Sequence, residues 1–294
     1  MLAIKQRFQS VIQRRIIYNE RLQDLTWRHF YTPDRNTPSV SLSGKGQKHL
    51  AELREAGITL IPGYEAAADH VAKTYLPALD GCAVPEGLTF DRLEMGARAA
   101  TTGTASGRVS YTDPGLRSLV FDETLAGILY NYYQRQPYYR EHPRVIRNQM
   151  TKNPTPEALA RAEVSSKFHI DCYRQISCML LLGDLTENDT HLEYALRSHN
   201  ERHPWNRYTY DEQSVLAKYE MLQAVGKRGT LIVMDAGAGL HRGVHKAGTS
   251  RKILHFNVTT GHYFSGDPKI APADLPDLSE RPDHVRRMLD HLTA

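Results

Sequence analysis

The sequence lacks the long apolar runs, cysteine pairs and charge blocks that mark several classes of protein. Its longest largely apolar stretch is Ile176–Leu182, far shorter than the roughly 18 residues that a membrane-spanning helix needs. It has only 3 cysteines in 294 residues and no CxxC spacing, which argues against a disulfide scaffold and for a reducing compartment. No block of Lys and Arg occurs, and the net charge is only +4, so we expect no nucleic-acid partner. Internal repeats and low-complexity tracts are absent as well.

What is present has the composition of an ordinary globular protein. Hydrophobic residues make up 40% of the chain and charged residues 24%. We expect one cytoplasmic domain over residues 1–294, large enough to bury a substantial core. The oligomeric state is left open.

The N-terminal segment is basic, since no acidic residue precedes Glu20. Apolar residues of Met1–Ile16 fall on one helical face, which fits a surface helix packed on the domain or a mitochondrial presequence. We divide the chain into a helical extension (1–46), a core (47–262) and a C-terminal tail with a helix (263–294).

Helical patterns come first along the core, and strand patterns follow. We predict helices at Gln47–Ala56, Ala66–Tyr75 and within Leu116–Tyr139, a strand at Ile58–Ile61, and a loop over the Gly-, Thr- and Ser-rich residues 96–115. Later strands are expected at Val145–Met150, Lys167–Cys172, Ile176–Leu182, Thr190–Leu196, Thr230–Asp235 and Arg251–Thr259. Residues 200–226, with a helix at Glu212–Ala224, are expected to form a lid insertion. Without alternation of helix and strand, this order predicts a mainly β fold with flanking helices, a jelly-roll or cupin-like core.

The residues with chemical potential begin with His169-Ile170-Asp171. In a strand, side chains at i and i+2 lie on the same face, so His169 and Asp171 converge. Burying an imidazole and a carboxylate together is energetically costly, and a divalent metal ion bound to both would offset that cost.

A second histidine is expected from a distant segment. An apolar strand is expected to end at Asp235, which we interpret as a turn-capping residue. Glycines follow it, and the chain then reaches His241. Two His and one carboxylate on one face are typical of non-haem Fe(II) sites that activate O₂. Arg251 follows His241 by ten residues, and its planar fork suits a carboxylate of a co-substrate. His245 is the rival to His241.

Two other classes of protein could use part of this set. A zinc-type hydrolase could use the same two His and one Asp, and a cupin-like module could bind a small molecule without catalysis. Neither has a use for Arg251.

These segments resemble the phytanoyl-CoA dioxygenase-like branch of the Fe(II)/2-oxoglutarate oxygenases. The resemblance covers about residues 47–262 and rests on GITLIPGY, FHIDCY, ENDTHLEYALRSHN, GTLIVMDAGAGLHRG and SRKILHFNV. It implies a double-stranded β-helix in which His169, Asp171 and His241 bind iron and Arg251 binds the distal carboxylate of 2-oxoglutarate. Asn148 and Met150 become candidates for the co-substrate site, because the corresponding strand lines it in relatives.

The implied activity is hydroxylation of an unactivated C–H bond of a small molecule by O₂, with release of succinate and CO₂. An anionic, biosynthetic compound is the candidate substrate class. Desaturation, cyclisation or epimerisation are alternatives within the same family. Two departures stand out: Arg197 occupies a position that is usually Gly before Ser198-His199, and Gly243 replaces a common hydroxyl residue two positions after His241. We interpret His199 as a turn residue and expect His255 to share a strand face with Arg251.

Overall fold

The computed structural model describes residues 39–93, 104–150, 166–171, 175–203, 210–260 and 269–293. The expected N-terminal helix at Met1–Ile16 and the residue Cys172 lie outside these ranges. Among the described residues, no helix combines the length and apolarity that crossing a membrane requires.

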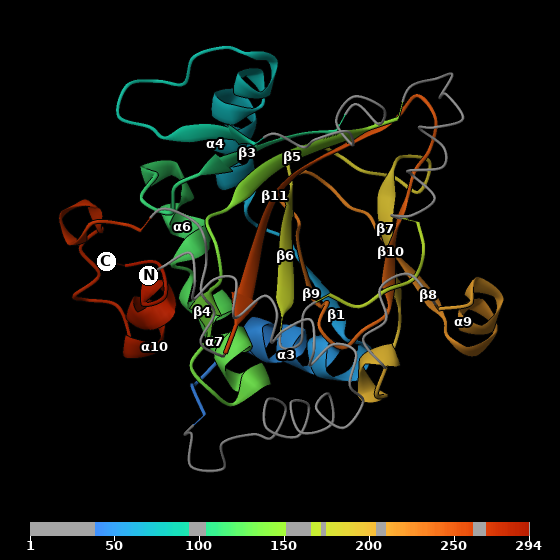
Figure 1. Ribbon diagram of the computed structural model, residues 1–294. Coiled ribbons are helices and arrows are strands. Elements are labelled where there is room, and N and C mark those ends of the chain that lie inside the picture. The colour runs from blue at the N-terminus through green and yellow to red at the C-terminus, as the bar shows by residue number, and fades with distance from the viewer. Residues whose placement is uncertain are drawn as a thin grey trace, which may run out of the picture.

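Two antiparallel sheets form the core, and they face one another in Figure 1. The larger sheet has eight strands. In spatial order its strands are β1 (Ile58–Ile61), β9 (Leu231–Asp235), β6 (Ile176–Leu181), β11 (Ser250–Thr259), β5 (Arg144–Gln149), β3 (Ala105–Val109) and β2 (Phe90–Leu93), with β4 (Tyr138–Tyr139) paired to β11. The smaller sheet has the order β10 (His241–Val244), β7 (His191–Ala195), β8 (Met221–Ala224). This is the jelly-roll arrangement that the sequence predicts.

Helices flank the sheets. They are α3 (Gly44–Ala56), α4 (Glu65–Tyr75), α6 (Arg117–Val120), α7 (Glu123–Tyr133), α9 (Glu212–Lys218) and α10 (Asp283–Arg286), with 3₁₀ turns η1 (Pro77–Asp80), η2 (Pro114–Leu116), η3 (Ser198–Asn200), η4 (Pro272–Asp274) and η5 (Arg287–Leu289). Several begin with a side-chain cap: Asp122 accepts a 2.6 Å bond from the backbone N–H of Leu125 at the start of α7. Gly57 ends α3 with φ 83°, a conformation that favours glycine.

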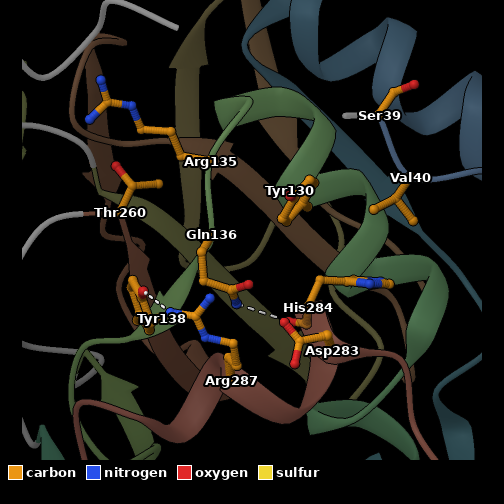
Figure 2. A pocket seen from close by; sticks show the side chains of 10 residues that line it. All are labelled: Ser39, Val40, Tyr130, Arg135, Gln136, Tyr138, Thr260, Asp283, His284 and Arg287. Atoms are coloured by element: carbon orange, nitrogen blue, oxygen red, sulfur yellow. Dashed lines mark hydrogen bonds between the residues drawn. The ribbon is translucent and has the colours of Figure 1, made fainter. Parts of the chain in front are cut away.

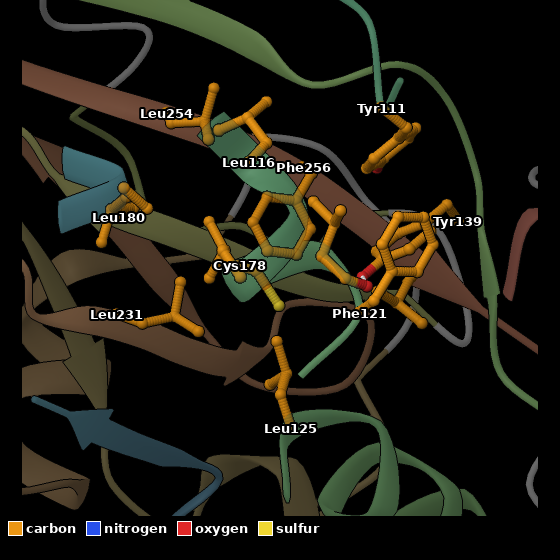
Figure 3. Packing of buried hydrophobic residues seen from close by; sticks show 14 of the residues in the cluster. Tyr111, Leu116, Phe121, Leu125, Tyr139, Cys178, Leu180, Leu231, Leu254 and Phe256 are labelled. Atoms are coloured by element: carbon orange, nitrogen blue, oxygen red, sulfur yellow. Dashed lines mark hydrogen bonds between the residues drawn. The ribbon is translucent and has the colours of Figure 1, made fainter. Parts of the chain in front are cut away.

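The larger sheet separates two apolar clusters because its side chains alternate between its faces. On the helical side, residues such as Cys178, Leu254 and Phe256 pack against α7 and its neighbours, as Figure 3 shows. On the inner side, Met179 and Ile253 face the smaller sheet and its Tyr194. The functional side chains of the larger sheet lie on this inner face.

Several details differ from the sequence-based expectation, and strands β2 and β10 were not predicted. The predicted loop 96–115 contains strand β3, in which Gly107 leaves room for the ring of Phe90, since a Cβ there would lie 2.1 Å from the ring atom Cε2. The helix expected within Leu116–Tyr139 stops at Tyr133, where Gln134 takes a left-handed conformation with φ 52°. The expected helix Glu212–Ala224 stops at Lys218, so the last part of the predicted insertion 200–226 is strand β8 of the smaller sheet. Of the strand expected at Lys167–Cys172, the described residues form only an isolated bridge, between His169 and His241.

Candidate metal centre

Two chain segments that lie far apart in the sequence meet at the edge of the smaller sheet. One contains His169 and Asp171 and leads toward β6, and the other leads from the end of β9 to His241 at the start of β10. The backbones of His169 and His241 exchange two N–H···O bonds of 3.0 Å each. The N–H of Asp171 donates to the carbonyl of Ala236 at 2.7 Å. The backbone pairing therefore brings together three side chains that lie far apart in the sequence.

The ligand atoms of His169, Asp171 and His241 lie within 4.8 Å of one another. Nε2 of His169 is 4.0 Å from Oδ1 of Asp171, and Nε2 of His241 is 3.8 Å from Oδ2. The structure thus brings together the three residues that the sequence predicts as a metal site. His245, the rival ligand, is not part of this group.

Both imidazoles are oriented by backbone carbonyls two residues earlier in the chain. Nδ1 of His169 lies 2.8 Å from the carbonyl oxygen of Lys167, and Nδ1 of His241 lies 3.0 Å from that of Gly239. Because a carbonyl only accepts hydrogen bonds, Nδ1 carries the proton in both rings. The lone pair is then on Nε2, the atom that faces the Asp171 carboxylate, as metal binding requires.

The turn before His241 is held from several sides. The Asp235 carboxylate accepts bonds from the N–H of Ala238 at 2.9 Å and from the hydroxyl of Tyr132 at 2.7 Å. This confirms Asp235 as a capping residue, and burial raises the pKa of its carboxyl group. Gly239 lies against Tyr194 so closely that a Cβ would sit 1.7 Å from its hydroxyl oxygen. The position of His241 therefore depends on a closely packed glycine turn.

Arg251 lies on the inner face of β11, directly opposite Asn148 of β5. Its Nε and Nη1 are buried and have no hydrogen-bond partner among the described residues. Burial lowers the pKa of the guanidinium to about 10, so the group stays charged at neutral pH. A buried charge without a partner is costly, and an anion that binds here would remove that cost. The donor set therefore fits a carboxylate, as the sequence predicts for this residue.

The remaining sequence candidates take different positions. Asn148 shares the inner face with Arg251, and Met150 lies just beyond β5, where it is buried and its N–H donates to the carbonyl of Thr249. His255 shares the face of Arg251 and lies opposite Met179, and burial lowers its pKa. For His245, burial and the nearby Arg251 charge both lower the pKa.

The turn that follows β7 keeps its geometry despite the replaced glycine. Arg197 adopts φ 65°, the left-handed region in which glycine is usual. Nε2 of His199 lies 3.0 Å from the carbonyl oxygen of Arg54 in α3, which agrees with a structural role for this histidine in the turn.

Sequence reasoning missed one residue that contacts the centre. Gln175 donates from Nε2 to Oδ2 of Asp171 at 3.0 Å. The one signal for it in the sequence is a glutamine placed just before the apolar strand β6, which no motif identifies.

A separate cavity of about 480 Å³ lies between the end of α7, β4 and the C-terminal segment. Figure 2 shows Arg287 bonded to Tyr138, and Gln136 bonded to the backbone of His284. No residue of the predicted metal or co-substrate site lines this cavity, so it is distinct from the centre described above.

Comparisons with known proteins give a match in structure only. No family model matches the chain, and no curated protein does. Among solved structures, it is similar to SnoN, a non-haem α-ketoglutarate-dependent epimerase from nogalamycin biosynthesis, with a TM-score of 0.52 and 13% identity over 73% of this chain and 80% of that one.

Two further solved structures share the arrangement. EctD from S. alaskensis, with 2-oxoglutarate and 5-hydroxyectoine, has a TM-score of 0.50 and 13% identity over 77% of this chain and 81% of that one. HygX from Streptomyces hygroscopicus, with nickel and 2-oxoglutarate, has a TM-score of 0.50 and 12% identity over 82% and 95%. At these identities the similarity establishes the fold, a jelly-roll core that these enzymes also have.

Proposed function

We propose that the chain is an Fe(II)/2-oxoglutarate-dependent oxygenase that oxidises a C–H bond of a small molecule. One observation carries the proposal: a His-Asp-His group lies at the edge of the smaller sheet, and the inner face of the larger sheet carries Arg251, whose Nε and Nη1 are buried with no hydrogen-bond partner in the part of the chain that the structure describes. Two imidazole nitrogens and one carboxylate oxygen are the donor set of non-haem iron sites with open positions. The similarity to SnoN, EctD and HygX supports the same class.

In this proposal each residue has a defined task. His169 and His241 offer Nε2 to the metal ion, and Asp171 offers a carboxylate oxygen. Arg251 orients 2-oxoglutarate by pairing with its distal carboxylate through Nε and Nη1, with Asn148 beside it. The apolar residue Ile253, next but one to Arg251 on β11, helps to exclude water from this charge pair, which strengthens it.

Bound iron, 2-oxoglutarate and O₂ would supply decarboxylation of the co-substrate to succinate and CO₂, coupled to oxidation of the substrate. The protein holds the reacting C–H bond in place and keeps water away. We propose hydroxylation as the outcome and membership of the phytanoyl-CoA dioxygenase-like branch, from the motifs around His169 and His241. Desaturation, cyclisation and epimerisation would need only a different fate of the oxidised substrate.

An anaerobic titration tests the proposal. Purified protein is titrated with Fe(II) with and without 2-oxoglutarate, and we expect a visible charge-transfer absorption only when both are present. In the matched variant Asp171→Ala, this absorption should be lost. Zinc that co-purifies, together with no absorption change from iron and 2-oxoglutarate, would contradict the oxygenase and favour a hydrolase. Binding of a small molecule without any succinate formation in air would favour a cupin-like binding module.

A further inference from the structure

Gln175 lies between the candidate metal centre and the larger sheet. It precedes β6, and only 3% of its surface is exposed. Its carbonyl oxygen accepts a 2.9 Å bond from the N–H of Gly237, in the turn that leads to His241. Its side-chain Nε2 donates to Oδ2 of Asp171 at 3.0 Å. Gln175 therefore contacts both segments that supply metal ligands.

The orientation of the Gln175 amide is set by Arg140. The guanidinium Nη1 of Arg140 donates to Oε1 of Gln175. Because arginine has donors and no acceptor, the amide oxygen must face Arg140 and the amide nitrogen must face Asp171. Arg140 is itself placed by its backbone N–H, which donates to the carbonyl of Asn257 in β11 at 2.9 Å.

A chain of polar side chains on the inner face supports this arrangement. Nε2 of Gln175 lies 3.3 Å from Oγ of Ser177, whose hydroxyl donates to Oδ1 of Asn257 at 2.8 Å. Nδ2 of Asn257 donates to Glu141 at 2.9 Å, and Arg144 bonds the same carboxylate at 2.7 Å. Buried groups that satisfy one another in this way hold their positions firmly.

The hydrogen bond from Gln175 distinguishes the two carboxylate oxygens of Asp171. Oδ2 accepts the Gln175 amide and lies 3.8 Å from Nε2 of His241, while Oδ1 lies 4.0 Å from Nε2 of His169 and takes no bond from Gln175. A carboxylate held through one oxygen is disposed to bind a metal ion through the other. Binding through a single oxygen would leave more of the metal ion's coordination positions for 2-oxoglutarate and O₂.

We infer that Gln175, oriented by Arg140, is a positioning residue that makes Asp171 a ligand through one oxygen only. The inference rests on the proposed metal site. Outer partners of metal ligands typically account for about 10- to 100-fold in metal affinity.

The test measures Co(II) binding by calorimetry and the visible absorption of the Co(II) protein, so it needs no turnover. Gln175→Met keeps the size of the side chain and removes the donor. We expect Co(II) to bind about 10- to 100-fold more weakly, with a changed absorption spectrum. Asn131→Leu is the matched control, since Asn131 is a buried amide that bonds the backbone of Val40 at 2.8 and 2.7 Å, away from the metal centre. It should leave affinity and spectrum as in the wild type.

Arg140→Met provides a second, independent variant. Without Arg140 the Gln175 amide can rotate and lose its donation to Asp171, so we expect a loss of Co(II) affinity in the same direction. Adding Arg140→Met to Gln175→Met should weaken binding little further, because both act through one hydrogen bond.

The possible failures are distinct. If folded Gln175→Met binds Co(II) within threefold of the wild type and with the same spectrum, Gln175 has a structural role only. Should Gln175→Met fail to fold, unchanged affinity in folded Arg140→Met overturns the inference. If the wild type itself binds no Co(II) and His169→Ala behaves identically, the proposed function fails along with the inference.

Discussion

Replacing Arg251 by Met should stabilise the ligand-free protein and remove its response to 2-oxoglutarate. Met keeps an apolar stem of similar length and removes a guanidinium whose Nε and Nη1 have no hydrogen-bond partner among the described residues. Burial lowers the pKa of Arg251 from its ordinary value to about 10. At about 1.4 kcal/mol for each factor of ten, the buried charge costs up to about 3 kcal/mol. We expect Arg251→Met to recover about 1–3 kcal/mol, which raises the Tm by about 2–6 °C.

The loss of affinity follows from the same contacts. Two charge-assisted hydrogen bonds to a carboxylate contribute about 1.5–3 kcal/mol each. Without them, 2-oxoglutarate should bind about 10²- to 10⁴-fold more weakly, since about 1.4 kcal/mol is a factor of ten.

Thermal unfolding under anaerobic conditions with Mn(II), with and without 2-oxoglutarate, measures both effects. The wild type should gain stability with the co-substrate, and Arg251→Met should start higher and gain nothing. Lys252→Met is the control, because Lys252 is the exposed neighbour on the same strand. The reasoning is refuted if Arg251→Met is less stable than the wild type and still responds to 2-oxoglutarate.

Three further predictions concern the metal ligands, the glycine turn and the pH dependence of stability. His241→Ala should abolish Mn(II) binding in calorimetry, and His245→Ala should retain it. Of these two histidines, His241 is the one with a ring nitrogen within 4.8 Å of the ligand atoms of His169 and Asp171. The reverse result would make His245 the ligand. Gly239→Ala should destabilise the fold by several kcal/mol or prevent folding, since its Cβ would lie 1.7 Å from the Tyr194 hydroxyl. The control Gly44→Ala, whose Cβ would meet nothing within 4 Å, should change the free energy of unfolding by about 1 kcal/mol or less. Equal effects of the two variants in urea unfolding would contradict this. Burial lowers the pKa of His203 below its ordinary 6.5. As the pH falls, the unfolded chain therefore takes up a proton at this residue before the folded protein does. The stability that neutral His203 contributes is present above pH 6.5 and is lost as the pH falls from 6.5 through the lowered pKa. Metal-free His203→Gln should therefore lose less stability than the wild type between pH 7.5 and 5 in urea unfolding, and an identical loss would show that His203 does not titrate as described.

The sequence predicted the parts of the fold that have a clear apolar pattern. The strands at Ile58–Ile61, Ile176–Leu181 and Ser250–Thr259 and the helix ending at Ala56 agree closely with expectation, as does the mainly β jelly-roll class. Strand β3 was missed because its sequence ASGRV carries few of the branched and aromatic residues typical of strands. Its glycine is explained only by Phe90 of the neighbouring strand, a contact that local pattern does not contain.

The sequence likewise predicted only part of the candidate site. His169, Asp171 and His241 form spacings that local chemistry makes recognisable, and the structure groups them. Gln175 follows Asp171 by only four residues and still gives no such signal, because its contact with the carboxylate depends on an amide orientation that Arg140 sets from a distant segment. Placement of Asn148 beside Arg251 follows from strand register, which the sequence alone does not fix.

The way in which the two imidazoles are held limits how this centre can change during evolution. Their Nδ1 partners are the carbonyls of Lys167 and Gly239, which every residue type supplies, so no exchange of side chain at those positions removes either acceptor. The carboxylate of Asp171 depends instead on the side chain of Gln175, which one codon change can replace. Variation in reactivity among descendants of this protein should therefore arise at the carboxylate side of the centre, while its histidine side stays constant.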